Sequence, residues 1–143
     1  MLTREPHVLA TLAEAYLGSG EQHLARETAE EAVSLAHERG VLAVALRAHL
    51  ALARVRLQTE GANAATAIET TLARAMTLVE QTGAKSQEPF IHVELAELAR
   101  LRGDEARRQR ELRAAHRRFT DMGAMGHAER LERTWPQLSG ARS

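Results

Sequence analysis

The sequence predicts an all-α fold made of repeated helical hairpins, and three observations support this prediction. Residues 32–40, 75–83 and 115–123 repeat one another, each running from an alanine through a helical pattern to a glycine. The glycines are 43 and 40 residues apart, a period typical of stacked supersecondary units. Apolar residues form 44% of the chain but aromatic residues only 3%, so helix-favouring alanine and leucine dominate.

The first hairpin is predicted over residues 6–40, after a lead-in of residues 1–5. Thr3 is expected to cap the first helix, with Glu5 and Pro6 in its first turn. The segment Gly18–Ser19–Gly20 ends that helix, and a second helix over 21–39 is closed by Gly40 in the left-handed conformation.

The second hairpin is predicted over residues 41–83, with helices over 41–58 and 64–82. Apolar residues at 46, 50, 53 and 57 mark one stripe of its first helix. Leu50 and Ala75 are 25 residues apart, whereas the corresponding pairs of the other repeats are 20 apart. We therefore expect about five extra residues in the polar loop 59–63.

The third hairpin is predicted over residues 86–123, with Ser86 as a helix cap and Pro89 in the first turn. Gly103 and Asp104 end one helix and cap the next, which runs to residue 122. A shorter helix over 127–135 carries Leu131 and Trp135 on one side and is expected to cover the end of this hairpin. Residues 136–143 are expected to form a flexible tail.

Composition limits the class of protein. The chain of 143 residues has no cysteine, which removes disulfides, thiolate nucleophiles and cysteine-based zinc sites. We expect a reducing cytoplasm, no signal peptide and no membrane span. The net charge is zero, but residues 1–99 are acidic and residues 100–143 are basic, an asymmetry that can steer a partner.

In register, the hairpins resemble the tetratricopeptide repeat (TPR) family over about residues 6–135. Repeat one matches at Leu9, Leu12, Ala13, Tyr16, Gly20, Ala25, Ala29 and Ala32. Repeat three matches in part, at Leu95, Ala96, Ala99, Gly103, Leu112 and Ala115, but has Arg108 where a small residue is usual. Repeat two is the weakest match, because Arg47 and Arg54 replace apolar residues. The resemblance implies a right-handed α-solenoid of three hairpins with a C-terminal capping helix. The repeat spacing and the segment 123–131 are similar to arrays at the C-terminal ends of large bacterial signalling ATPases, some of them transcription regulators or adenylate-cyclase proteins.

No motif predicts catalysis, a cofactor or a metal. Gly83–Ser86 lacks the glycine that a phosphate-binding loop has directly before its lysine, and His92 and Glu94 lack the cysteine pair of a zinc deaminase. The seven histidines form no HExxH motif. We therefore expect each histidine to be a solvated or partly packed residue of a helix. Glu94 and Glu97 precede Arg100, a spacing typical of an exposed ion-pair ladder.

The resemblance also implies a groove formed by the first helices of the hairpins, where family members hold peptides. The matching positions are His7, Ala10, Glu14, Ala48, Leu52, Val93, Glu97 and Arg100. Leu52 and Val93 are the predicted anchors, and Glu14 and Glu97 are predicted to select a partner helix with basic residues. The alternative is that this face binds nothing.

The helix after Asp104 carries a basic face predicted at Arg107, Arg110, Arg113 and Arg117. Arginine binds carboxylates and phosphates in a bidentate manner, but aromatic residues and lysines that would support nucleic-acid binding are scarce. This basic face has three alternative interpretations: a solvated face, a contact with an acidic partner or subunit, or a nucleic-acid contact. Nucleic acid is the least expected of the three.

These predictions favour a non-catalytic protein-interaction scaffold in a bacterial signalling or regulatory protein. The first helix is expected to leave apolar surface open for upstream repeats or a second subunit. The alternatives are a structural element that forms oligomers through that helix, and an enzyme on a helical scaffold, which would need a buried cluster of titratable groups.

Overall fold

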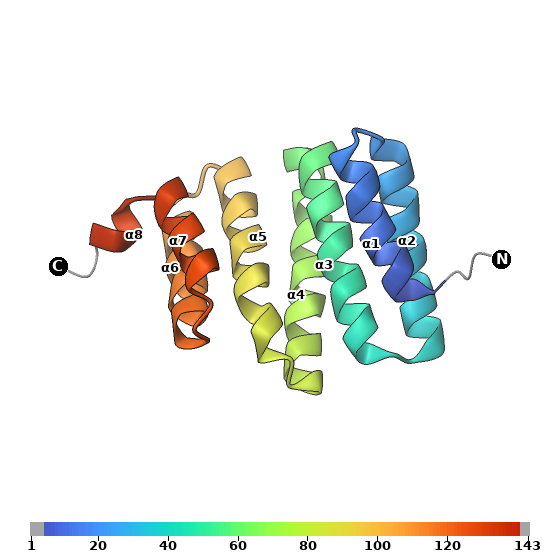
Figure 1. The fold of residues 1–143 in the computed structure, drawn as a ribbon. Coiled ribbons are helices and arrows are strands. Elements are labelled where there is room, and N and C mark those ends of the chain that lie inside the picture. The colour runs from blue at the N-terminus through green and yellow to red at the C-terminus, as the bar shows by residue number, and fades with distance from the viewer. Residues whose placement is uncertain (1–4, 141–143) are drawn as a thin grey trace. The chain divides into compact units, whose positions relative to one another are not determined.

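The computed structural model describes residues 5–140, and over this range the chain is helical without any β-strand. The predicted all-α class is confirmed. The chain divides into two compact units, one ending at Lys85 and one beginning at Ser86. Figure 1 shows the order of the helices.

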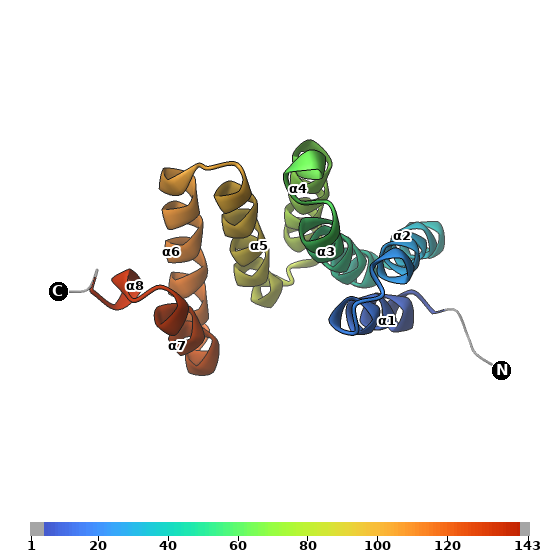
Figure 2. The same cartoon turned by 90° about the horizontal axis from the view of Figure 1, so that it is seen from above.

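The first unit contains four long helices: α1 (Pro6–Gly18), α2 (Gln22–Arg39), α3 (Leu42–Thr59) and α4 (Ala65–Thr82). α1 packs against α2 and α3 packs against α4, while α3 also contacts both α1 and α2. Figures 1 and 2 both show α1, α2 and α3 side by side. The enlarged turn predicted between the last two helices is present and contains a short 3-10 helix, Gly61–Ala64.

Alanines make the contact between α1 and α2 close. Ala25, Ala29, Ala32 and Ala36 of α2 are fully buried. Ala25 and Ala29 share a cluster with Ala13 of α1, and Leu52 and Val55 of α3 complete it. Small side chains at a contact allow helix axes to approach closely, so this repeat needs no aromatic core.

The predicted glycine cap of α2 is confirmed. Gly40 follows the helix with a φ of 68°, and its backbone N–H donates to the last carbonyls of α2. A side chain is strained in this left-handed conformation, whereas glycine adopts it freely. The cap lets the chain reverse within two residues and begin α3.

Two arginines that weakened the repeat pattern have partners across the α1–α3 contact. Arg54 Nη1 donates to Glu14 Oε1 at 3.0 Å, and Arg47 Nη2 donates to Thr11 Oγ1 at 3.4 Å. Polar pairs therefore replace apolar contacts at these two positions of repeat two.

The second unit contains α5 (Glu88–Leu101), α6 (Glu105–Asp121), α7 (Met125–Thr134) and the short α8 (Gln137–Gly140). α5 and α6 form a hairpin, and α7 packs on α6. Asp104 caps α6 as predicted, because its Oδ1 accepts a hydrogen bond from the Arg107 backbone N–H at 3.0 Å.

The predicted cap at Ser86 is wrong. A 3-10 helix, Lys85–Gln87, occupies this turn, and Gln87 precedes α5 without any side-chain cap. The cap predicted at Thr3 lies outside the described residues. Glu5, which was expected in the first turn of α1, immediately precedes that helix instead.

The end of the second unit differs from the predicted flexible tail. Pro136 does end α7, but residues 137–140 form α8, whose Leu138 is buried with Trp135, Leu112 and Ala96. The Arg108 guanidinium carbon lies 4.9 Å from the centre of a Trp135 ring, a cation–π distance. Leu131 packs against the same cluster, so Leu131 and Trp135 both contact the α5–α6 hairpin that their helix was expected to cover. That helix runs from Met125 to Thr134 and not over 127–135.

Candidate interaction surfaces

The first hairpin exposes an apolar surface, here called the open face, formed by Val8 and Leu12 of α1 and Leu24 of α2. Their exposed fractions are 45%, 38% and 39%. Val8 and Leu12 are one helical turn apart and so share one side of α1. This agrees with the expectation that the first helix leaves apolar surface uncovered.

The contacts of α3 explain why this face is open. Arg54 of α3 reaches Glu14 of α1, and Arg56 of α3 reaches Glu30 of α2 at 3.3 Å. Leu12 lies about 160° around the axis of α1 from Glu14, and Leu24 lies about 120° around that of α2 from Glu30. The open face therefore points away from α3.

The predicted groove is wrong at three of its four apolar positions, which are buried. Ala10 and Ala48 are buried together in one cluster. Leu52, a predicted anchor, is only 6% exposed and packs against alanines of α1 and α2. Because α3 has helices on more than one side, nearly all of its apolar residues are core, and none of these three is available to a partner.

The charged groove residues have partners within the chain. Glu14 is ion-paired with Arg54, and both carboxylate oxygens of Glu97 accept from Arg100 Nε, at 3.0 and 3.1 Å. Val93, the other predicted anchor, is half-buried against the cluster around Phe119, while His7 is exposed. The eight predicted positions are divided between the two units.

The basic face of α6 is narrower than predicted. Arg107 pairs with Glu111, its Nε lying 3.6 Å from Oε2. Arg110, Arg113 and Arg117 are exposed along the outer side of α6, whereas Arg118 is bound to Glu88. Three arginines, and not four, therefore form an outward basic stripe.

Two histidines that are distant in sequence meet between α2 and α3. The Nε2 atoms of His37 and His49 lie 2.8 Å apart. His49 is 9% exposed, and its Nδ1 is buried without a hydrogen-bond partner among the described residues. We assign the proton of neutral His49 to Nε2, which donates to His37, because the other tautomer would bury an unpaired N–H.

Burial lowers the pKa of His49 to about 4, and the nearby charges of His37 and Arg74 add to this effect. His49 is therefore neutral at physiological pH. Protonation of His49 would place an N–H at its buried Nδ1, which has no acceptor among the described residues.

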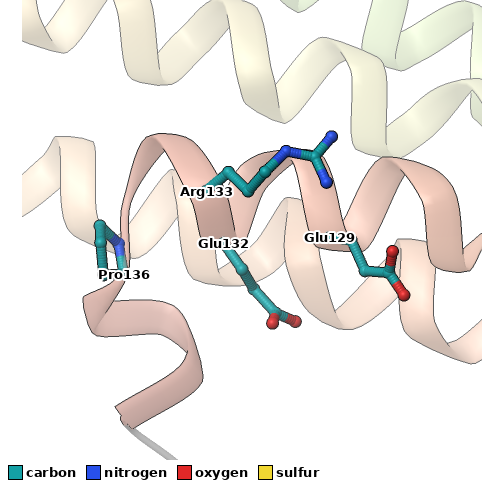
Figure 3. A pocket seen from close by; sticks show the side chains of 4 residues that line it. All are labelled: Glu129, Glu132, Arg133 and Pro136. Atoms are coloured by element: carbon teal, nitrogen blue, oxygen red, sulfur yellow. The ribbon is translucent and has the colours of Figure 1, made fainter.

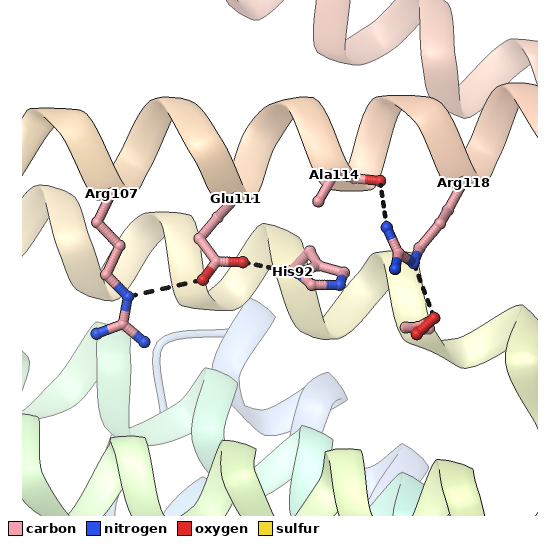
Figure 4. Close-up of polar contacts among 6 residues, drawn as sticks. His92, Arg107, Glu111, Ala114 and Arg118 are labelled. Carbon is pink, nitrogen blue, oxygen red and sulfur yellow. Dashed lines mark hydrogen bonds and ion pairs between the residues drawn. The ribbon is translucent and has the colours of Figure 1, made fainter.

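A half-buried polar cluster lies between α5 and α6 (Figure 4). His92 Nδ1 and Glu111 Oε1 are 2.7 Å apart. On the same helix, the Arg118 guanidinium donates to Glu88 Oε1 at 2.8 Å and to the carbonyl of Ala114 at 3.3 Å. Burial raises the pKa of Glu111, but the hydrogen bond with His92 and the charges of His92 and Arg107 lower it. The lowering effects together outweigh burial, so the pKa lies below its usual value.

This cluster contains the titratable groups that an enzyme would need. Its carboxylate orients an imidazole, as in a general-base pair. However, His92 Nε2 is buried without a partner among residues 5–140. The geometry therefore joins α5 to α6 rather than presenting a base to a substrate.

The surface of the described residues includes two open hollows. One, of about 370 Å³, is lined by Glu129, Glu132, Arg133 and Pro136 (Figure 3). Glu132, which lines this hollow, has its Oε2 2.7 Å from His116 Nε2, a contact that ties α6 to α7. The other hollow, of about 210 Å³, is lined by residues 22, 23, 26, 59 and 60.

The sequence did not reveal these histidine contacts. The partners are 12, 19 and 16 residues apart, for His37–His49, His92–Glu111 and His116–Glu132 respectively. Each contact crosses a helix–helix interface, so only the pairing of the helices could have indicated it. Within residues 5–140, no group of three or more histidine, aspartate or glutamate side chains is placed to hold a metal ion.

No protein-family model, curated protein or solved structure matches this chain. None of the helices described is both long enough and apolar enough to cross a membrane.

Proposed function

We propose that this protein is a non-catalytic scaffold that binds another protein through the open face of its first hairpin. The observation that carries this proposal is the exposure of Val8, Leu12 and Leu24 on one side of a hairpin whose other side is covered by α3. Apolar side chains gathered on one face commonly mark a site of protein–protein contact.

Three features support a TPR-like architecture. Helices pack as hairpins in both units, and alanines fill the α1–α2 contact. Left-handed glycines come after α2, α4 and α6, at Gly40, Gly83 and Gly123. We propose that the three hairpins continue one another as a right-handed solenoid, with α7 covering the last. By the same resemblance, the proposed setting is a cytoplasmic bacterial signalling or regulatory protein.

The binding surface in this proposal differs from the family's groove. Leu52 and the groove alanines are core residues, and Glu14 and Glu97 are ion-paired within the chain. A partner would have to break these contacts to use the groove, whereas it would only have to displace water from the open face. The free energy of burying apolar surface, about 25 cal/mol per Å², is therefore gained more readily at the open face.

A second candidate function uses the same surface. A symmetric dimer through α1 would also cover Val8 and Leu12, and such isologous contacts are common. The protein would then be a structural oligomerisation element.

The test is native co-purification with mass spectrometry on three proteins: the original protein, the Leu12→Asp variant and the Met125→Asp variant. Met125 is 47% exposed in the second unit, so its substitution is a matched change outside the open face. We expect partners recovered with the original protein and with Met125→Asp to be lost with Leu12→Asp, at unchanged helix content by circular dichroism. Recovery of the same partners by all three proteins would overturn the proposal, and a dimer that Leu12→Asp dissociates would favour the second candidate.

A further inference from the structure

We infer that the partner bound by the open face is an amphipathic helix with leucine-type anchors on one side and lysine or arginine along its flank. This inference rests on the proposed function and names the chemistry of the partner. It follows from the shape of the apolar surface and from the charges that border it.

The apolar surface follows the length of the hairpin. Arg39 Nη1 is bonded to Glu5 Oε2 at 3.0 Å, which places the end of α2 beside the start of α1. Leu35, which is partly buried, then lies near Val8, and Leu24 lies near the turn that follows α1. From Val8 to the end of α1 is about 15 Å at 1.5 Å per residue. About three turns of a partner helix, with anchors spaced three and four residues apart, match this length.

Glutamates border this surface on α2. Glu27 and Glu38 are exposed, lie eleven residues apart and fall within about 20° of one another around the helix axis. The Glu27 side chain is 56% exposed, and its contact with His23 at 3.1 Å leaves it at the surface. Arg39, the nearby arginine at the end of α2, is already paired with Glu5. A ligand lying along the open face thus meets negative charge on one side.

The same charges disfavour a second copy of this chain as the occupant. A dimer that packs α2 on α2 would place glutamates of one copy near those of the other, and like charges at an interface oppose binding. A dimer that packs α1 on α2 would set these glutamates against α1, which has no lysine or arginine. The arginines at 110, 113 and 117 are complementary in charge, but their side of α6 carries no large apolar residue that could serve as an anchor. A separate basic amphipathic helix satisfies both requirements.

The test uses two fluorescein-labelled helical peptides of about 18 residues with leucines at positions i, i+4, i+7 and i+11, one flanked by lysines and one by glutamates. Fluorescence anisotropy measures their binding to the protein, to Leu12→Asp, to Met125→Asp, and to the double variant Glu27→Lys, Glu38→Lys. We expect the lysine peptide to bind the original protein and Met125→Asp alike, and at least tenfold more weakly to Leu12→Asp. The double variant should reverse the preference, binding the glutamate peptide more tightly than the lysine peptide.

Equal binding of both peptides to the original protein, or lysine-peptide binding that Leu12→Asp leaves unchanged, would overturn the inference. Sedimentation velocity separates this failure from that of the proposed function. If the protein is a dimer that Leu12→Asp dissociates, the occupant is a second copy: the inference fails while the open face remains an interface. If the protein is monomeric, binds neither peptide and loses no partner on Leu12→Asp, both fail.

Discussion

At the scale of single residues, His49 shows how the fold fixes a charge state. Its pKa is lowered from 6.5 to about 4, so between these pH values the unfolded chain binds a proton that the folded chain does not. Stability therefore rises with pH in this window and is lost as the pH falls from 6.5 toward 4. The free energy of unfolding that His49 contributes is about 2 kcal/mol smaller at pH 5 than at pH 7.

We predict that His49→Leu flattens the pH dependence of stability between pH 7 and pH 5. Urea unfolding at several pH values measures it, and His23→Leu is the control, because the His23 side chain is 71% exposed. The expected result is a smaller loss of unfolding free energy on acidification for His49→Leu only. The same pH dependence in His49→Leu and in the unchanged protein would show that another group is responsible.

Leu12 and Leu52 show what the sequence could and could not predict at this scale. Both lie at apolar positions of helical stripes, and the 3.6-residue period identifies both as members of an apolar side. The period does not say whether a neighbour covers that side. Leu52 is covered because α3 is packed by α1, α2 and α4, whereas Leu12 faces away from α3.

At the scale of helices, Asp104 and Ser86 offer a matched comparison of two predicted caps. Asp104 accepts a hydrogen bond from the start of α6, whereas Ser86 lies inside a 3-10 turn and caps nothing. We expect Asp104→Ala to lower the free energy of unfolding by about 1 kcal/mol and Ser86→Ala to change it by less than about 0.5 kcal/mol. Thermal or urea unfolding followed by circular dichroism measures both, and equal effects would contradict the assignment.

Gly40 and Gly126 provide a second pair. Gly40 has a φ of 68°, whereas Gly126 lies inside α7, and a methyl group at either position would meet no atom within 4 Å. Gly40→Ala should therefore lose about 1 kcal/mol through backbone strain alone, and Gly126→Ala should gain up to about 1 kcal/mol from helix propensity. Denaturant midpoints test the prediction, which is contradicted if both changes act in the same direction.

Helix positions were predictable because their signals are local. The left-handed glycines and Asp104 set most helix ends within one residue of the expected position. Helix α8 was missed because Pro136 indicated an end, whereas Leu138 is buried in a cluster with Ala96 of α5 and Leu112 of α6. Those two contacts join parts of the chain that no local pattern relates.

At the scale of the whole molecule, the two units have cores of their own. Leu46 is buried in the first unit, and Phe119 packs with Ala115 and Ala128 in the second. We predict that Phe119→Ala, a loss of about 3–5 kcal/mol, raises amide hydrogen exchange mainly in residues 86–138. Leu46→Ala should raise it mainly in residues 5–85. Exchange that rises equally in both units for either variant would show that they open together.

The central claim is that the open face of the first hairpin, and not the groove of the family, binds the partner. Hydrogen–deuterium exchange of the protein with and without its co-purified partner tests this most directly, because it reports on every helix at once. Binding at the open face predicts slower exchange in α1 and α2, with the amides of α5 unchanged. Slower exchange in α3 and α5, with α1 and α2 unaffected, would contradict the claim.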